Sequence, residues 1–458
     1  MKLKKLENFI FEKMSETNLP GISVRLIKDD EVLLSRGFGF RDIEDGLPST
    51  EKTLYGIGSI TKSFTALSIM QLKEEGKLDT KDPVKNYLPL EIKPKGKHVR
   101  IKHLLTHSSG IPALAYAESS IRRTVGSGEN WTPIADIDDM MDFVNGAGDW
   151  VYSKPGQRWF YLNEGYVLLG AIIEECSDLS YEEYVRENIL SPLGMDRTFF
   201  DLEKVEEDQD VATPHILSKE GEQIPSKYPS EGISADGALI SSVVDLSRYI
   251  RMYLNGGKLG KNRIVTEESL EEMESFGVST PSLEGPFGES GYGYGLGITK
   301  DFFGKELIGH GGSVLVSTGY IGFVPDEKVG ISLLANGNGY PLAHLGMYGL
   351  SLSMDRDPEN CPFIYREMAL KELEGVYETY RGTMTAKVKK AGDMMEVRIE
   401  DKYTENTAIL IPDDIGDEKR RFYYLDGCNK IPVDFDLNED RVDLIFERYR
   451  LKKVGKLT

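Results

Sequence analysis

Residues 56–77 read GIGSITKSFTALSIMQLKEEGK, and within them a glycine-rich approach turns into a helix. Phe64, Leu67 and Met70 recur at helical spacing, and Gly76 is the kind of residue at which a helix ends. This spacing predicts a helix from about residue 60 to residue 77. Because the glycines come first, we expect Ser59 at the N-terminus of that helix.

Ser59 and Lys62 lie three residues apart, so a helix places them on one face. The N-terminus of a helix offers unpaired N–H groups and a positive potential, which stabilise an oxyanion beside the serine. A neighbouring lysine can take the hydroxyl proton and make the serine a nucleophile. A helix-capping serine followed by a surface lysine would give the same letters, so the motif needs further support.

Two more groups of residues that could take part in catalysis follow along the chain. Tyr161 and Asn163 come after a Pro-Gly turn at 155–156, and a phenol beside an ammonium can move protons while an amide holds a carbonyl. Residues 310–312, HGG, are expected just before a strand around residue 315, where two glycines allow a substrate close to the backbone. The alternatives are a core tyrosine, an asparagine N-cap and a loop histidine.

The rest of the sequence indicates two domains that differ in their predicted secondary structure. Runs at 22–27 and 32–36 predict a hairpin. Further strands are expected at 315–324 and 329–335, and further helices at 99–107, 163–176, 180–191 and 243–255. After residue 368, apolar and polar residues alternate in about seven short runs, the pattern of a small antiparallel barrel or sandwich. The sequence therefore predicts an α/β (α+β) domain over 1–352, a linker over 353–368 and an all-β domain over 369–458.

The composition narrows the classes of function. The chain has 458 residues and a formal net charge of −20, from 55 Lys and Arg against 75 Asp and Glu. Such an anion repels phosphate backbones and anionic lipid, so we expect neither nucleic acid nor a membrane as a partner. No window approaches 18 consecutive apolar residues, as a transmembrane helix would require. Two acids within residues 6–14 predict an amphipathic helix rather than a signal peptide.

The cysteines and histidines predict no metal site. The three cysteines are too scattered for a disulfide framework or a metal cluster, which favours a cytoplasmic location. His103 and His107 have the spacing of a zinc-binding pair, but no third ligand accompanies them, so we expect no metal and no other cofactor. Only four glutamines accompany many Lys and Glu residues, a balance typical of heat-adapted proteins, so we expect a thermostable protein.

Taken in order, S-x-x-K at 59–62, Y-x-N at 161–163 and H-x-G at 310–312 resemble the motifs of the serine β-lactamase and penicillin-binding-protein superfamily. The stretch 103–112, HLLTHSSGIP, resembles a signature of its class C-like, CubicO-type peptidase and esterase branch. Similar agreement extends over four further stretches, namely 161–170 (YLNEGYVLLG), 192–195 (PLGM), 237–242 (GALISS) and 291–297 (GYGYGLG). The resemblance covers most of residues 15–340 and implies an antiparallel sheet flanked by helices.

The resemblance also implies a serine hydrolase that works through an acyl-enzyme. Ser59 would be the nucleophile, Lys62 its activating neighbour, and Tyr161 the carrier of protons to and from the leaving group. Asn163 would orient the acyl side of the substrate, and the backbone N–H groups of Ser59 and Ser313 would form the oxyanion hole. The implied substrate-binding residues are Asn163, His310, Gly312 and Ser313.

One departure from the superfamily pattern concerns the substrate. Penicillin-recognising members usually carry Lys-Thr-Gly where this chain has HGG at 310–312. A neutral imidazole is a poorer partner than lysine for a carboxylate, so β-lactamase activity is not expected. The H-x-G form is similar to that of the peptidases and esterases of the branch. It implies a peptidase, with an aminopeptidase or an enzyme for peptides with D-amino acids as the finer options, and a carboxylesterase as the alternative.

The C-terminal domain adds a second resemblance. Residues 373–377, LEGVY, resemble the opening of the lipocalin-like barrel that some members carry. This resemblance implies a homo-oligomer that assembles through the barrel. The competing hypothesis is a non-catalytic binding protein whose barrel holds an apolar ligand, but the presence of Ser59, Lys62 and Tyr161 together favours an enzyme.

Overall fold

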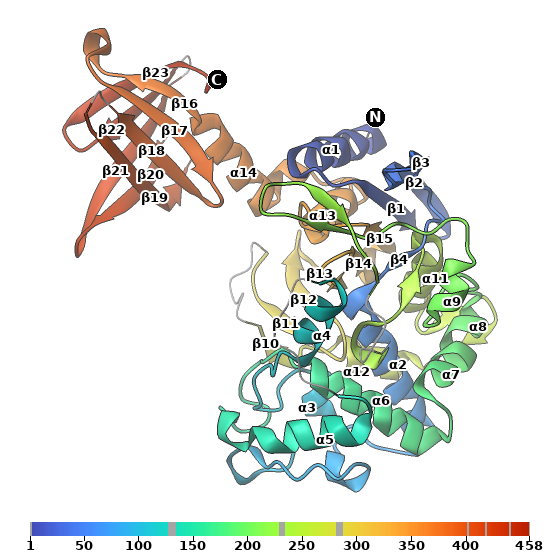
Figure 1. Cartoon of the computed structure of the whole chain (residues 1–458). Coiled ribbons are helices and arrows are strands. Elements are labelled where there is room, and N and C mark those ends of the chain that lie inside the picture. Colours follow the sequence, from blue (N-terminus) through green and yellow to red (C-terminus); the bar gives the residue numbers. More distant parts are fainter. Residues whose placement is uncertain are drawn as a thin grey trace. The chain divides into compact units, whose positions relative to one another are not determined.

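In the computed structural model, residues 2–126, 134–228, 234–280, 287–400, 403–416, 419–438 and 441–457 are described. The chain forms two compact units, Met1–Pro358 and Glu359–Thr458. The first unit is a large antiparallel sheet flanked by helices, and the second is a small barrel (Figure 1). The fold class predicted from the sequence is therefore confirmed.

Within the described residues, the first unit contains a nine-stranded antiparallel sheet with the order β10-β11-β12-β13-β14-β15-β1-β2-β3. Its strands are β1 (Gly21–Lys28), β2 (Glu31–Asp42), β3 (Leu47–Pro48), β10 (Val278–Ser279), β11 (Ser290–Tyr292), β12 (Gly297–Phe302), β13 (Lys305–Ser313), β14 (Thr318–Val324) and β15 (Val329–Ala335). The predicted hairpin is β1 with β2, and β1 also pairs with β15, which joins the first strands of the chain to the last strands of the sheet.

Both faces of the central strand β15 are covered by helices. A side chain on Gly330 would clash with Ile250 of helix α11 (Val243–Leu254), and the Ser332 hydroxyl donates to the Val243 carbonyl at 3.0 Å. Ile331 and Leu333, which alternate with Gly330 and Ser332 along the strand, approach helix α13 (Leu342–Ser353) on the other face. Because side chains alternate along a strand, a fully buried strand needs apolar or small residues at every position. This accounts for the unbroken run of buried residues in β15.

The helix that carries the S-x-x-K motif is central to the first unit. A 3₁₀ turn (Gly58–Ile60) leads into α2 (Thr61–Glu74), close to the predicted range. Nearly all of α2 is buried, and its small polar residues bond within the helix or to neighbouring carbonyls; Thr65, for example, donates to the Ala235 carbonyl at 2.6 Å. A helix buried on all sides needs such self-satisfied polar groups, since no water reaches them.

The other helices surround α2 and the sheet (Figure 1). They are α1 (Lys2–Thr17), α3 (Ile101–Leu105), α4 (Tyr116–Thr124), α5 (Ile137–Asn145), α6 (Asn163–Ser177), α7 (Tyr181–Val185), α8 (Ser191–Leu193), α9 (Leu202–Glu206), α10 (Ser234–Gly237) and α12 (Glu267–Glu274). Short strand pairs are β4 (Tyr55–Gly56) with β7 (Ile240–Ser241), β5 (His215–Leu217) with β6 (Gln223–Pro225), and β8 (Lys258–Leu259) with β9 (Asn262–Arg263). In the part of the chain that is described, no helix is long and apolar enough to span a bilayer.

Two local predictions need correction. The HGG stretch at 310–312, expected just before a strand, itself lies within a strand. It forms the C-terminal part of β13, where it pairs with β14. The sequence pattern did not predict this strand because glycine has a low propensity for strands. The expected linker at 353–368 is also not free of regular structure, since helix α14 (Pro362–Leu373) begins within it. Pro362 starts that helix, as proline does well at a first helical position.

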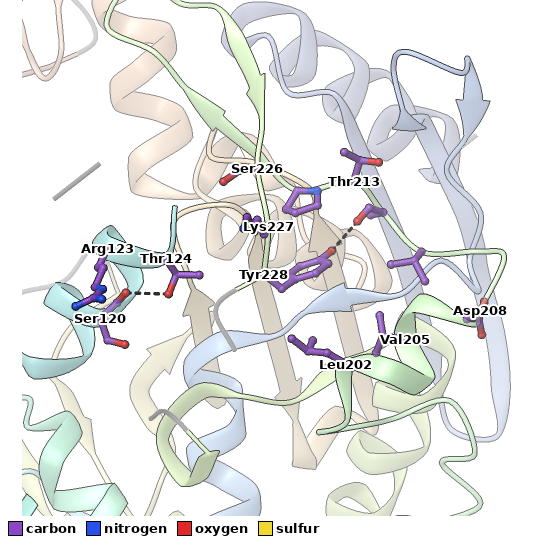
Figure 2. A pocket seen from close by; sticks show the side chains of 13 residues that line it. Ser120, Arg123, Thr124, Leu202, Val205, Asp208, Thr213, Ser226, Lys227 and Tyr228 are labelled. Carbon is purple, nitrogen blue, oxygen red and sulfur yellow. Dashed lines mark hydrogen bonds between the residues drawn. The ribbon is translucent and has the colours of Figure 1, made fainter. Parts of the chain in front are cut away.

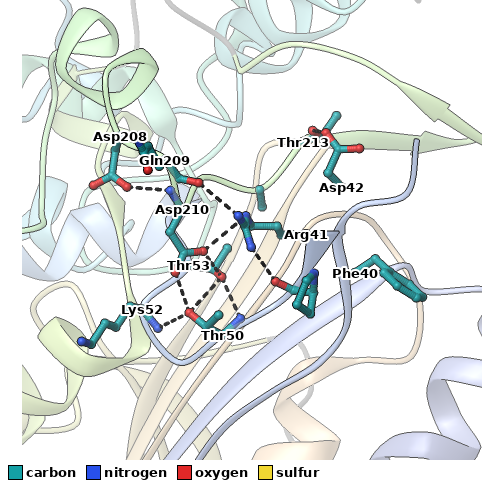
Figure 3. A network of polar contacts seen from close by, with 12 residues as sticks. Phe40, Arg41, Asp42, Thr50, Lys52, Thr53, Asp208, Gln209, Asp210 and Thr213 are labelled. Atoms are coloured by element: carbon teal, nitrogen blue, oxygen red, sulfur yellow. Dashed lines mark hydrogen bonds and ion pairs between the residues drawn. The ribbon is translucent and has the colours of Figure 1, made fainter. Parts of the chain in front are cut away.

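A polar network fixes the chain just before the S-x-x-K helix (Figure 3). The Asp210 carboxylate accepts hydrogen bonds from the hydroxyls of Thr50 and Thr53, both at 2.6 Å, and forms an ion pair with Arg41 at 3.5 Å. The Leu54 N–H also donates to the Asp210 carbonyl. Segments far apart in sequence are thereby tied to the turn that leads through β4 to the 3₁₀ turn.

The second unit is a closed antiparallel barrel that follows α14. Its strands, in order, are β16 (Gly375–Glu378), β17 (Thr385–Ala391), β18 (Met394–Glu400), β19 (Glu405–Ile415), β20 (Lys419–Asp426), β21 (Asn429–Asn438), β22 (Arg441–Phe446) and β23 (Tyr449–Gly455). Pairing of β16 with β23 closes the barrel. The rings of Tyr377, Phe422 and Phe435 are buried and in contact with one another inside it. An eight-stranded barrel is just wide enough for such a filling of side chains.

Candidate active site

The lysine of the S-x-x-K motif makes three hydrogen bonds, one of them to the serine. The Lys62 Nζ atom donates to Ser59 Oγ at 3.1 Å, to Asn163 Oδ1 at 2.8 Å and to the backbone carbonyl of Asp236 at 2.7 Å. Lys62 has no exposed surface, whereas Ser59 is half-buried. A buried ammonium is tolerated only when its protons are satisfied, and here three acceptors match three donors.

The structure excludes the simpler explanations of these motifs. The residue before α2 is Ile60 and the one before the 3₁₀ turn is Ile57, so Ser59 caps neither element. Lys62 is not a surface lysine, as its full burial shows. Asn163 is the first residue of α6 rather than its N-cap, and its side chain points to Lys62.

Tyr161 lies beside Lys62 and is held there by a histidine. The Lys62 Nζ atom is 4.9 Å from the centre of the Tyr161 ring. His107 packs on that ring with centroids 4.0 Å apart, and it accepts the N–H groups on both sides of Tyr161, that of Phe160 at its carbonyl and that of Leu162 at Nδ1. The Tyr161 hydroxyl oxygen is buried and has no hydrogen-bond partner within the described residues. Its hydrogen-bonding capacity is therefore not used by any described residue.

His310 faces the same group of rings. Its Nε2 atom is 2.7 Å from the Tyr292 hydroxyl, and its Nδ1 atom is 2.5 Å from the Gly311 carbonyl. The carbonyl can only accept, so Nδ1 carries the proton and Nε2 accepts from Tyr292. Burial, with a smaller effect from the charge of Lys62, lowers the pKa of His310 to about 4. The ring is thus neutral at physiological pH.

The end of β13 lies directly against the 3₁₀ turn that holds Ser59. A Cβ atom on Gly312 would be 1.9 Å from the Ile57 carbonyl oxygen, and one on Gly58 would be 2.7 Å from the Ser313 nitrogen. Gly58 also has a φ of +53°, a conformation that favours glycine. The end of β13 and the turn that holds Ser59 can pack this closely because these two positions lack side chains.

Acidic side chains gather behind Lys62, and the sequence motifs did not point to them. Glu118 of α4 accepts a hydrogen bond from Asn163 Nδ2 at 3.2 Å. Asp236 is buried beside Lys62, and burial raises the pKa of its carboxyl to about 7 although the lysine charge opposes this. Burial also raises the pKa of Glu164, which accepts the Tyr116 N–H. Only the tertiary structure brings these carboxyls from α4, α6 and α10 together.

A cavity of about 690 Å³ adjoins this region (Figure 2). It is lined by Ser120, Arg123 and Thr124 of α4, by residues from Leu202 to Pro214, and by Ser226, Lys227 and Tyr228. The Tyr228 ring lies 3.2 Å from where a Cβ on Gly56 would be, and its hydroxyl donates to the Ala212 carbonyl at 2.9 Å. Tyr228, one of the lining residues, therefore contacts β4, the strand that precedes Ser59.

The residues predicted as the site thus converge, whereas His103 and His107, which have the spacing of a zinc-binding pair in the sequence, do not form such a pair. His103 belongs to α3, but His107 follows the helix with a φ of +55°, so the two are not on one helical face. Among the described residues, no group of three or more His, Cys, Asp or Glu side chains is placed to hold a metal ion. His107 instead supports Tyr161, a role for which the stretch 103–112 gave the only sequence signal.

Comparison with known proteins agrees with this geometry. The family described as "Beta-lactamase" matches residues 6–349, which is most of the chain. The chain belongs to the beta-lactamase family. This is a family of serine hydrolases. The family described as "Pab87 octamerisation domain" matches residues 358–452, the part that forms α14 and most of the barrel.

Individual relatives cover different parts of the chain. The octameric penicillin-binding protein homologue from Pyrococcus abyssi has a TM-score of 0.92 and 48% identity, over 99% of this chain and 100% of that one. Protein flp from Staphylococcus aureus is 27% identical over 347 residues, 73% of this chain and 63% of its own length. The chain therefore spans less than two thirds of that curated relative. The D-amino acid amidase from Ochrobactrum anthropi SV3, with a TM-score of 0.61, 24% identity and coverage of 77% and 99%, shares the fold.

Proposed function

We propose that the protein is a serine peptidase that forms an acyl-enzyme at Ser59. The observation that carries this proposal is the contact between Lys62 Nζ and Ser59 Oγ at 3.1 Å, inside a site where Lys62 is fully buried. Because the Lys62 amine is out of contact with solvent, it can exchange a proton with the Ser59 hydroxyl rather than with bulk water. Asn163 and the Asp236 carbonyl hold it in place through two further hydrogen bonds.

The hydrogen-bond partners of Lys62 suit both of its protonation states. As an ammonium it donates to all three acceptors; as a neutral amine it can donate to Asn163 Oδ1 and the Asp236 carbonyl while its lone pair accepts from Ser59. In the acylation step, Ser59 Oγ bonds to the substrate carbonyl carbon and its proton passes to the Lys62 amine. The negative charge that develops on the carbonyl oxygen is stabilised by the backbone N–H groups of Ser59 and Ser313.

Tyr161 completes the cycle in this proposal. Its hydroxyl gives a proton to the leaving nitrogen as the C–N bond breaks, and Lys62, close to the ring, restores that proton. In deacylation, Tyr161 passes its proton to the now neutral Lys62 amine while it takes a proton from water, and the water oxygen bonds to the acyl carbon. Lys62 then returns a proton to Ser59 Oγ as the ester bond breaks, so Ser59 leaves as the alcohol. The unpartnered, buried hydroxyl of Tyr161 supports this role, because it is free to bond to a reacting atom.

A peptide or small amide is the proposed substrate, and a small ester is the alternative. His310 is neutral and bonded to Tyr292, so it offers no charge to a substrate carboxylate. This supports a substrate other than a penicillin. A matched pair of alanine p-nitroanilide and alanine p-nitrophenyl ester distinguishes the two substrate classes. A peptidase cleaves the anilide with a kcat/KM comparable to that for the more reactive ester, whereas an esterase cleaves only the ester efficiently.

We also propose a homo-oligomer that assembles through the barrel. The similarity to an octameric homologue from Pyrococcus abyssi over the whole chain supports it. The barrel interior is filled with rings such as Phe422 and Phe435, which weighs against a non-catalytic protein that holds an apolar ligand there. Light scattering after size-exclusion chromatography of the full chain tests the oligomer. A monomer at micromolar concentration contradicts it.

The nucleophile is tested with a fluorophosphonate probe and mass spectrometry of the labelled peptide. We expect one adduct, on Ser59, and none in the Ser59→Ala variant. Lys62→Met should slow labelling by about 1,000-fold, because nucleophile and base act as a unit. Lys73→Met, on the same helix but 29% exposed and paired with Glu272, is the control that should label normally. A folded protein without an adduct on Ser59 contradicts the proposal.

Two properties expected from composition complete the proposed function. We propose a cytoplasmic location and heat adaptation, supported by the scattered cysteines and the four glutamines. Cell fractionation tests the location. A melting temperature in the ordinary mesophile range, about 45–65 °C, contradicts heat adaptation.

A further inference from the structure

Glu118 is an exposed carboxylate at the edge of the candidate active site. It lies in the first turn of α4 and accepts a hydrogen bond from Asn163 Nδ2 at 3.2 Å, while Asn163 Oδ1 accepts from Lys62 at 2.8 Å. Lys62 has no exposed surface and Asn163 is 9% exposed, whereas Glu118 is open to solvent. The chain of hydrogen bonds therefore runs from the buried lysine to a charged group that a substrate can reach.

The charge of Glu118 has no ion-pair partner in the described part of the chain. Among the described residues, no lysine or arginine forms an ion pair with it. Lys62, which is linked to Glu118 through Asn163, already uses its three protons on other acceptors. Two further carboxyls, Glu164 and Asp236, lie nearby, and His310 is neutral. The negative charge of Glu118 therefore attracts a cation to this edge of the site.

The position of Glu118 next to Asn163 indicates which part of the substrate carries that cation. Under the proposed function, on which this inference rests, Asn163 orients the acyl side of the substrate. In an unblocked amino acid amide or peptide, the α-ammonium nitrogen is separated from the reacting carbonyl carbon by one Cα atom. We propose that Glu118 binds this free α-ammonium group, so that the enzyme removes amino acids from unblocked N-termini.

Glu118 could instead act only by orienting the Asn163 amide, and the substitution to glutamine separates the two roles. A glutamine at this position keeps an oxygen that accepts from Asn163 Nδ2 and removes the negative charge. An orienting role is therefore preserved in Glu118→Gln, whereas recognition of an ammonium group is lost. Glu31→Gln, an exposed position at the start of β2, makes the same chemical change away from the site and is the matched control.

The experiment compares free and N-acetylated alanine p-nitroanilides, in D and L forms, with wild-type protein, Glu118→Gln and Glu31→Gln. We expect Glu118→Gln to lower kcat/KM for the free-amine anilide by about 100-fold, the usual effect of losing a charged hydrogen bond. Turnover of the acetylated anilide should change by less than about 3-fold, since it makes no such bond. Glu31→Gln should match the wild type on both.

Labelling of Ser59 by the fluorophosphonate probe is measured in the same preparations and reports on the proposed function separately. An equal loss on both anilides, or no loss on either, overturns the role of Glu118 while labelling of Ser59 persists. An enzyme that labels at Ser59 but cleaves only the acetylated anilide, or neither anilide, also overturns it. Absence of labelling in the wild type overturns the proposed function and this inference together.

Discussion

Asp236 is a buried acid whose ionisation should cost the protein stability. Its side chain is 2% exposed, and its Oδ1 atom has no hydrogen-bond partner within the described residues. Burial raises its pKa to about 7, against an ordinary value of 3.8. The substitution Asp236→Asn keeps the shape, removes the ionisation and leaves the backbone carbonyl that holds Lys62.

The sign and size of the effect follow from proton linkage. Between pH 3.8 and about 7 the folded state binds a proton on Asp236 that the unfolded state has already released. Stability of the wild type therefore falls as pH rises through this window, and the loss is complete above pH 7. The difference between a pKa of 3.8 and one of about 7 corresponds to about 4 kcal/mol. The asparagine variant carries no such loss, so its advantage should grow from near zero at pH 4 to about 4 kcal/mol at pH 8.

Denaturant unfolding at fixed protein concentration between pH 4 and pH 8 measures this difference. All three tryptophans precede residue 358 in the sequence, and Trp150 and Trp159 lie in the first unit, so tryptophan fluorescence reports on the unit that contains Asp236. Asp149→Asn, at an exposed position, controls for the chemical change itself. A stability difference between Asp236→Asn and wild type that stays constant with pH would refute the reasoning.

Further predictions concern the site, the network beside it and the barrel. Gly312→Ala places a Cβ 1.9 Å from the Ile57 carbonyl oxygen, so β13 must move and labelling of Ser59 should slow by at least about 100-fold in a folded protein; an unchanged rate would show that the contact does not matter. The imidazole of His310 should titrate with a midpoint near pH 4 by NMR, and a midpoint near 6.5 would contradict its burial. Asp210→Ala removes two charged hydrogen bonds and should lower the unfolding free energy of the first unit by about 2–4 kcal/mol, measured by tryptophan fluorescence, whereas a loss below about 0.5 kcal/mol would dismiss the network. Phe435→Ala opens the filled barrel and should cost about 3–5 kcal/mol in the unfolding of the second unit, measured by circular dichroism; a cost under about 1 kcal/mol would mean that the ring is not part of a packed core.

Motifs and local periodicity are enough to predict several elements of this fold. The apolar spacing after Ser59 predicts α2, and the alternation after residue 368 predicts the barrel. The strand that carries His310 does not show in the sequence pattern, because its glycines are poor strand formers and only pairing with β14 makes it a strand. The start of α14 inside the expected linker is hidden for a similar reason, since residues 353–368 have no clear period.

The sequence by itself determined the order of the chemical groups, the two-part layout and the family resemblance, because these depend on residue type and local spacing. The tertiary structure alone decided that Lys62 is buried between Ser59, Asn163 and the Asp236 carbonyl. It alone decided that Glu118 touches Asn163, 45 residues further along the chain. Contacts between distant segments depend on how the sheet and helices pack, and no local pattern encodes which polar groups that packing brings together or shields from water.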